Sequence, residues 1–185
     1  MSKSAYLVLE DGSRFRGVPF GSASEAYGEV VFNTSMTGYQ EMLTDPSYAG
    51  QIVVPTYPMV GNYGISKEDN ESKEVQVSGF VVRQQCQEPS HRESTSTLTD
   101  FLLGQGIPGI SEVDTRAVTK RIRTHGVMMG AMAINISPEE ALSELRKKPQ
   151  YGNVDYVKQV TAAESYNWTQ SLKHLAPETT DIKIL

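Results

Sequence analysis

The sequence predicts an α/β domain built on a mixed sheet, with many strands and a few helices. Short apolar runs, several rich in Val, Ile or aromatic residues, recur from residue 6 to residue 136, and turn-forming residues separate them. Helix start signals stand at Asp114 and Ser137. With 185 residues, 38% of them hydrophobic, the chain is long enough for one core with polar loops beside it.

The first half of the chain is expected to consist mostly of strands. Asp11-Gly12 between two β-prone runs is a strong hairpin signal. One helical turn at 40–43 and a turn at 45–47, with Pro46 inside it, separate later strands. Residues 57–64 are rich in turn formers and predict a loop, and residues 67–74 predict a charged, solvated segment. The expected strands are 6–9, 14–17, 29–32, 51–56 and 75–83.

The second half combines helices with two further strands. Asp114 is expected to cap a helix that Gly126 ends. Ser137 at the N-cap and Pro138 at the first helical position predict the start of another helix. Gly104 is expected to close an earlier one. The expected helices are 94–103, 115–125 and 138–148, and the expected strands are 107–110 and 127–136.

Beyond Pro149 the hydrophobic pattern weakens. Residues 154–160 are interpreted as a strand or an extended arm, and residues 165–185 as a mostly polar linker. We therefore place one domain at residues 1–150 and an extended arm and linker at residues 151–185.

Charge and composition narrow the classes of partner. The net charge is −5, and the longest cationic cluster is Arg146-Lys147-Lys148, so we expect no nucleic-acid partner. The chain has neither an apolar secretory segment at its start nor an apolar run long enough to span a bilayer. Together with a single cysteine, these features predict a cytoplasmic protein without a membrane partner.

Three kinds of chemistry receive little support. Cys86 precedes His91 by five residues, but no glycines form a nucleophile elbow around it, so an independent enzyme that uses Cys86 remains only a rival hypothesis. The histidines 91, 125 and 174 are scattered, so we expect no metal site. The Gly-rich residues 104–109 follow a helix and enter a strand, the reverse of the order that cradles phosphate.

One loop favours binding. Residues 32–41 place hydroxyls, amides and an aromatic ring at the end of an expected strand, where loops often bind ligands or partners. This observation leaves open an alternative, a stand-alone small-molecule binding domain built on residues 33–40.

Residues 28–48 closely resemble the small chain of glutamine-dependent carbamoyl-phosphate synthetase. Residues 7–12, 56–62 and 109–116 are similar to other parts of that family, and the resemblance extends to about Thr169.

The resemblance implies a β/β/α domain of the swivelling type that contacts a large synthetase subunit. A class I glutamine amidotransferase domain with a Cys-His-Glu triad would follow it. The assembled ligase (EC 6.3.5.5) would hydrolyse glutamine, pass ammonia through a tunnel, and make carbamoyl phosphate from bicarbonate and two ATP for arginine and pyrimidine synthesis. ATP and Mg would bind to the large subunit.

The sequence departs from the family where catalysis would occur. The nucleophile motif G-x-C-x-G is missing and Cys86 does not match it, so no catalytic residue, metal or cofactor is expected in this chain, which we predict to be inactive alone. The last residues, 182–185, would begin the first strand of the glutaminase domain.

Ser47 matches a family position that contacts L-glutamine at the seam between the two small-chain domains. Its hydroxyl would also suit a cap on its own turn, and both roles are compatible. The partners implied are the large subunit, the glutaminase domain and L-glutamine.

Overall fold

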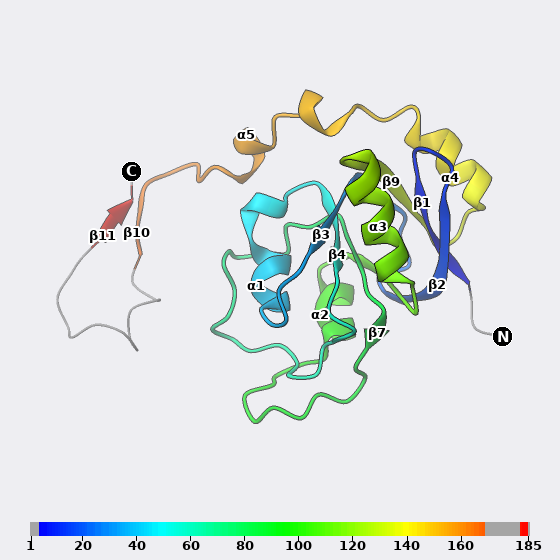
Figure 1. Cartoon of the computed structure of the whole chain (residues 1–185). Helices are drawn as coiled ribbons and strands as arrows, with labels where there is room; N and C mark the ends of the chain where they lie inside the picture. The colour runs from blue at the N-terminus through cyan, green and yellow to red at the C-terminus, as the bar shows by residue number, and fades with distance from the viewer. Residues whose placement is uncertain (1–3, 169–181, 185) are drawn as a thin grey trace. The chain divides into compact units, whose positions relative to one another are not determined.

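The computed structural model describes residues 4–168 and 182–184 and divides into two compact units. The first unit extends to Val154 and contains the core, and the second runs from Asp155 to Leu185 (Figure 1). Each unit is described by itself below.

The first unit is a closed seven-stranded barrel with the order β1-β2-β8-β6-β4-β3-β9. The pairings β3–β4, β4–β6 and β6–β8 are parallel. The other pairings of the barrel are antiparallel. The mixed α/β class is therefore confirmed, whereas closure of the strands into a barrel was not predicted. The strands are Ala5–Leu9 (β1), Arg14–Gly21 (β2), Ala26–Asn33 (β3), Gln51–Pro55 (β4), Gly79–Val81 (β6), Pro108–Ser111 (β8) and Met128–Ala133 (β9).

The apolar interior of the barrel is formed by alternate residues of the strands. Every strand of the barrel except β2 contributes buried residues to one cluster, and the half-buried Phe15 of β2 packs against it. Side chains two residues apart on a strand point to the same face. Helix α3 (Thr115–His125) packs against β3 and β4 and adds Val118 and Ile122 to this cluster. Buried members from the strands include Leu7, Val30, Ile52, Val81, Ile110 and Met132.

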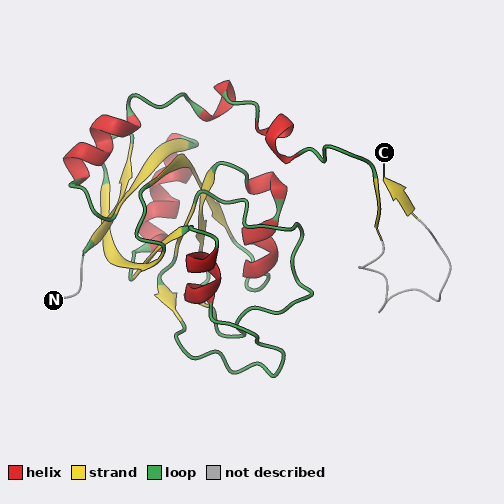
Figure 2. Ribbon diagram, turned by 180° about the vertical axis from the view of Figure 1, so that it is seen from behind, coloured by secondary structure: helices red, strands yellow, loops and turns green. Residues whose placement is uncertain are grey.

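The remaining helices of this unit cover the outer surface of the barrel (Figure 2). Helices α1 (Tyr39–Thr44) and α2 (Leu98–Gly104) pack with Phe80 of β6 in a second cluster. Helix α4 (Pro138–Leu145) packs with Val8 of β1 in a third. Residues pointing outward from β4, β6 and β9 are therefore buried as well, which explains the nearly continuous apolar runs of β4 and β9.

Local sequence signals place the two longest helices correctly. The Asp114 carboxylate accepts the Ala117 N–H at 3.0 Å, and α3 ends at Gly126, whose φ is 88°. The Ser137 hydroxyl accepts the N–H of Glu140, whose carboxylate accepts the Ser137 N–H in return, which completes a capping box.

Several expected elements differ in extent. Strands β2 and β3 are longer than expected, and β9 and α4 are shorter. Only Gly79–Val81 of the 75–83 segment is a strand, although Val75 and Val77 are buried in a loop. Helix α2 begins at Leu98, because the Thr97 hydroxyl caps it. The 57–64 loop contains the short strand β5 (Met59–Val60), which pairs with β7 (Gln84–Gln85).

In the second unit, the expected strand or extended arm at 154–160 is wrong. Tyr156–Val160 forms helix α5, and the Asp155 carboxylate caps it by accepting the Lys158 N–H at 2.9 Å. Strand β10 (Tyr166–Trp168) pairs with β11 (Ile182–Ile184) in antiparallel register. The rest of the expected linker, residues 169–181 and 185, lies outside the described residues. Before this unit, Tyr151–Asn153 forms a 3-10 turn.

We predict that Gly28→Ala destabilises the barrel. A Cβ at position 28 would lie 2.4 Å from the backbone oxygen of Gly50, so β3 and β4 would have to separate. We expect the free energy of unfolding to fall by about 1–3 kcal/mol in urea titrations. The control is Gly104→Ala, where no atom lies within 4 Å of the added carbon and stability should be unchanged or slightly higher. Equal stability of the two variants would contradict the prediction.

Candidate functional site

Ser47 lies in a single 3-10 turn, Pro46–Tyr48, between α1 and the amino end of β4. The Asp45 carboxylate accepts the Ser47 N–H at 2.8 Å and so caps the turn. The Ser47 side chain is exposed, and its hydroxyl makes no hydrogen bond to any residue that the structure describes. The capping role considered for this hydroxyl thus belongs to Asp45, and the hydroxyl is free to bind a polar ligand.

The Ser47 turn is fixed by two tyrosines. The Tyr48 hydroxyl accepts the Asn33 side-chain N–H at 2.8 Å, which connects the turn to the end of β3. The Tyr151 hydroxyl donates to the backbone oxygen of Ala49 at 2.9 Å. The chain therefore passes beside the Ser47 turn shortly before the first unit ends at Val154.

The exposed part of the expected binding loop, residues 34–37, lies at the other end of α1, beyond the carboxyl end of β3 (Figure 1). The Asn33 side chain, which the loop hypothesis included, accepts the Ser35 N–H at 2.7 Å and donates to Tyr48. The structure thus places Ser47 and the 34–37 loop at opposite ends of α1, and the Asn33 side chain bonds to both segments, through Tyr48 and Ser35.

Gln40 has a structural role in this segment. Its side chain is 0% exposed, and its amide nitrogen donates to the Ser66 oxygen and to Asn70, each at 2.7 Å. Its amide oxygen accepts the Ser66 N–H at 2.8 Å. Because both polar atoms of the side chain are bonded to Ser66 or Asn70, Gln40 is not available to a ligand.

Two stacked tyrosines hold the start of α1. The rings of Tyr39 and Tyr63 lie 4.2 Å apart, and the Tyr63 hydroxyl accepts the N–H groups of Gly38 and Tyr39 at 2.8 and 3.1 Å. No side chain within the helix caps it, so Tyr63 supplies the acceptor from a distant loop. The Tyr39 hydroxyl donates to the Gly64 oxygen. Burial raises the pKa of both tyrosines, so their hydroxyls stay protonated well above neutral pH.

Glu41, in the first turn of α1, was not singled out by sequence reasoning. Its Oε2 atom is buried and, within the described part of the chain, has no hydrogen-bond partner. The helix dipole favours a carboxylate in the first turn of a helix. An acidic residue at this position is therefore the sequence signal that could have drawn attention to Glu41.

Cys86 does not form a catalytic pair with His91. Its thiol is half-buried and donates to the Glu88 oxygen at 3.3 Å, while His91 Nδ1 accepts the Glu93 N–H at 3.3 Å. No hydrogen bond joins these two described residues, so the geometry gives the rival enzyme hypothesis no support.

The described ranges, 4–168 and 182–184, contain no group of three or more His, Cys, Asp and Glu residues that could hold a metal ion. No helix in them has both the length and the apolar character needed to cross a membrane.

We predict that Tyr63→Phe destabilises α1 specifically. Removing the hydroxyl leaves two backbone N–H groups without an acceptor, so the free energy of unfolding should fall by about 1–2 kcal/mol. Hydrogen exchange of α1 amides should accelerate in the same variant. Tyr57→Phe, at an exposed position, is the matched control and should leave both measurements unchanged. Unaltered exchange in Tyr63→Phe would show that the capping contact is unimportant.

Comparison with known proteins identifies the family. The family model described as "Carbamoyl-phosphate synthase small chain, CPSase domain" matches residues 7–132. The carbamoyl phosphate synthase small chain of Syntrophotalea carbinolica is 50% identical over 167 residues, which are 90% of this chain and 44% of that protein. The one from Aquifex aeolicus is 47% identical over 171 residues, 92% of this chain and 46% of the relative.

The chain thus spans less than half the length of these curated relatives. Among solved structures, an aminopeptidase from Aneurinibacillus sp. strain AM-1 aligns with 72% of this chain and 31% of its own at a TM-score of 0.40 and 16% identity, which is too weak to bear on the fold. The match of residues 7–132 and the identities near 50% show that the chain belongs to the carbamoyl-phosphate synthase small chain family.

Proposed function

We propose that this chain is the amino-terminal domain of the small subunit of glutamine-dependent carbamoyl-phosphate synthetase and that it has a docking role without catalysis of its own. The observation that carries the proposal is the family match over residues 7–132 in a sequence that lacks a G-x-C-x-G nucleophile motif. In this function the domain binds the large subunit, to which the designation "small chain" points, and holds the glutaminase domain in place.

The parent reaction in this proposal converts glutamine, bicarbonate and two ATP to carbamoyl phosphate in the cytoplasm, for arginine and pyrimidine synthesis. Glutamine hydrolysis belongs to the amidotransferase domain, and ATP and Mg belong to the large subunit. The contribution of this chain is to bind and orient these parts.

Ser47 is proposed to line the glutamine site. Three features support this role: the side chain is exposed, its hydroxyl is not engaged by the described residues, and Asp45 and Tyr48 fix the turn that presents it. The position of Tyr151 beside Ala49 directs the chain past this turn, which suits a following domain that would supply the other walls.

The stand-alone small-molecule binding domain is the weaker alternative. It depended on the polar groups of residues 33–40, and the side chains of Asn33 and Gln40 are bonded within the fold.

We predict that Ser47→Ala, in the complete small chain assembled with its large subunit, raises the KM for glutamine by about two- to tenfold, the equivalent of one lost hydrogen bond. Synthesis from free ammonia should be unchanged, because it does not use the glutamine site. Ser90→Ala, at another exposed serine, is the control. An unchanged KM would remove Ser47 from the glutamine site.

The docking role predicts that the 185-residue chain binds the large subunit from the same genome at low micromolar concentration, measured by calorimetry. The chain alone should release no ammonia from glutamine, and Cys86→Ser should bind the large subunit like the wild type. Absence of binding would refute the docking role, and ammonia release that Cys86→Ser abolishes would favour the rival enzyme.

A further inference from the structure

Helix α3 carries a charge that contrasts with the rest of the chain. Its sequence TRAVTKRIRTH contains four Arg or Lys residues and no acid, in a chain whose net charge is −5. Three of these cations, Arg116, Lys120 and Arg123, are exposed. The fourth, Arg121, pairs with Asp11 of the β1–β2 turn at 2.6 Å and has a role within the fold.

The three exposed cations form one stripe. With 100° between successive residues, Arg116, Lys120 and Arg123 lie within about 60° of one another around the helix axis. The buried residues Val118 and Ile122 lie on a different face, toward the barrel. None of the three has an ion pair within the part of the chain that the structure describes. We call these three residues the basic stripe.

Helix stability does not account for the whole stripe. Arg123, in the last turn, suits the negative end of the helix dipole. Arg116 stands in the first turn, where a positive charge is unfavourable and an acid would stabilise the helix. The Asp114 carboxylate caps the helix by accepting the Ala117 N–H, so at this end it is hydrogen-bonded to the backbone. A cation at a position that is unfavourable for the helix points to a role outside the helix.

The basic stripe begins at an edge of the barrel that also exposes large apolar side chains. Met36 follows β3 and is 73% exposed. Tyr57 and Met59 follow β4 and are 41% and 39% exposed. Strands β3 and β4 are parallel and α3 packs against both, so these loops leave the barrel at one edge. A hydrogen bond from the Thr56 N–H to the Asn33 oxygen, at 2.8 Å, holds the two loops together.

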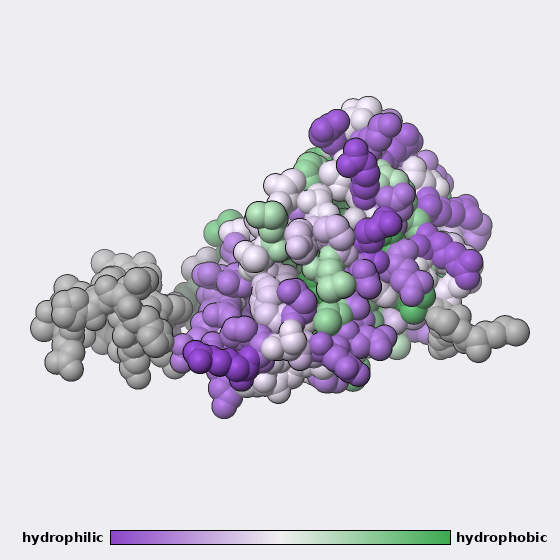
Figure 3. All heavy atoms as spheres, turned by 60° about the horizontal axis from the view of Figure 1, so that its bottom comes forward, coloured by the Kyte–Doolittle hydropathy of each residue, from purple (hydrophilic) through white to green (hydrophobic). Residues whose placement is uncertain are grey.

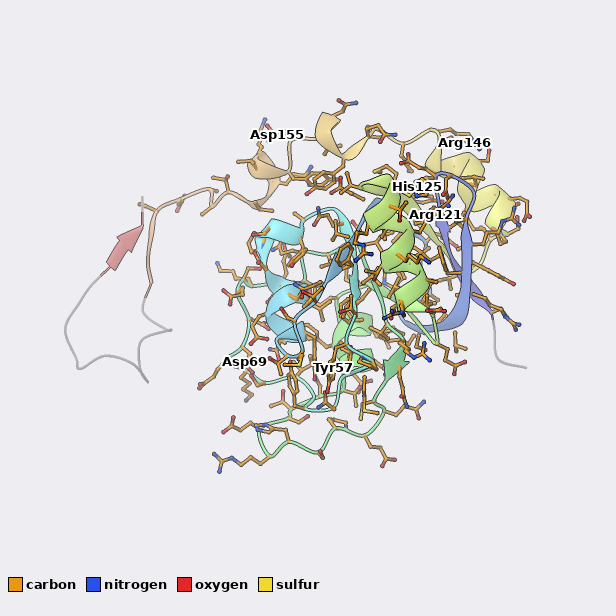
Figure 4. All side chains as sticks on the ribbon, viewed as in Figure 1. Tyr57, Asp69, Arg121, His125, Arg146 and Asp155 are labelled. Carbon is orange, nitrogen blue, oxygen red and sulfur yellow. The ribbon has the colours of Figure 1, made fainter. Side chains whose placement is uncertain are left out.

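The figures agree with this placement. Figure 4 shows Tyr57 at the end of the barrel where α3 begins, and His125 at the other end. Figure 3, which turns that end toward the viewer, shows apolar residues gathered in the middle of the face with hydrophilic residues around them.

A strained residue lies at the same edge. Glu112, directly after β8, has a φ of 62°, in the left-handed region that costs a non-glycine residue about 1 kcal/mol. Such strain is retained most often where a site requires a particular backbone geometry. Its N–H donates to the Arg83 oxygen at 3.0 Å, which joins the loops that follow β6 and β8.

We propose that the basic stripe, together with Met36, Tyr57 and Met59, is the surface through which this domain binds the large subunit, and that the large subunit presents an acidic strip beside an apolar patch. This inference rests on the proposed docking function and specifies where docking occurs. Charge complementarity identifies the sign of the partner surface. A protein fits better than a nucleic acid, because the apolar side chains offer anchors and the net charge of −5 repels a polyanion.

The test uses two triple variants of the 185-residue chain that change the net charge equally. One reverses the basic stripe, with Arg116→Glu, Lys120→Glu and Arg123→Glu. The other is the control, with Lys67→Glu, Lys73→Glu and Arg92→Glu at exposed positions of other loops. Binding to the large subunit is measured by calorimetry at several salt concentrations, after thermal unfolding has shown that each variant is folded.

We expect reversal of the stripe to weaken binding by at least about tenfold and to abolish most of its salt dependence, while the control changes affinity by less than about threefold. A Met36→Ser, Met59→Ser variant should weaken binding without changing the salt dependence. Equal weakening by the two triple variants would overturn the assignment of the surface, as would tighter binding of a labelled DNA than of the large subunit. If the wild type does not bind at all, the proposed function itself fails.

Discussion

The pairing of β3 with two neighbours is the interaction on which the arrangement of this domain depends. β3 is parallel to β4 and antiparallel to β9, and these pairings help to close the barrel. The parallel pairing requires the chain to return from the end of β3 to the start of β4, and α1 with the Ser47 turn makes that return. The close approach of Gly28 to Gly50 allows the two strands to come together.

This topology separates two surfaces. The amino edge of the parallel strands carries the Ser47 turn, beside which the chain passes at Tyr151. The carboxyl edge carries the exposed apolar residues and the start of the basic stripe. Under the proposed function, the first edge would contribute to the glutamine site and the second would bind the large subunit, so that one rigid barrel would set the distance between them.

Local signals made part of this fold predictable. The β1–β2 hairpin and the caps of α3 and α4 involve residues close together in the sequence, and the structure contains them where they were expected. Closure of the barrel depends on pairings between distant segments, which no local pattern specifies. Helix α5 was missed because its five residues include two valines, although Asp155 offers a cap signal.

The candidate site was less predictable than the fold. Ser47 was found through the family resemblance, since an exposed serine on a turn has no distinctive pattern. Gln40 was assigned to a ligand loop because its hydrogen-bond partners, Ser66 and Asn70, lie more than twenty residues away. The cations of the basic stripe can be read in the sequence of α3, but only the fold places the start of this helix at the same barrel edge as Met36 and Met59.

The capping of α1 by Tyr63 has a mechanical consequence. Tyr63 belongs to the same loop as Tyr57 and Met59, and it holds the first turn of a helix only six residues long, which leads directly into the Ser47 turn. The Tyr48 and Tyr151 hydroxyls hold the turn at the other end of the helix. Tyrosine hydroxyls therefore anchor α1 at both ends, which keeps the serine at a fixed distance from the loop that contains Tyr63.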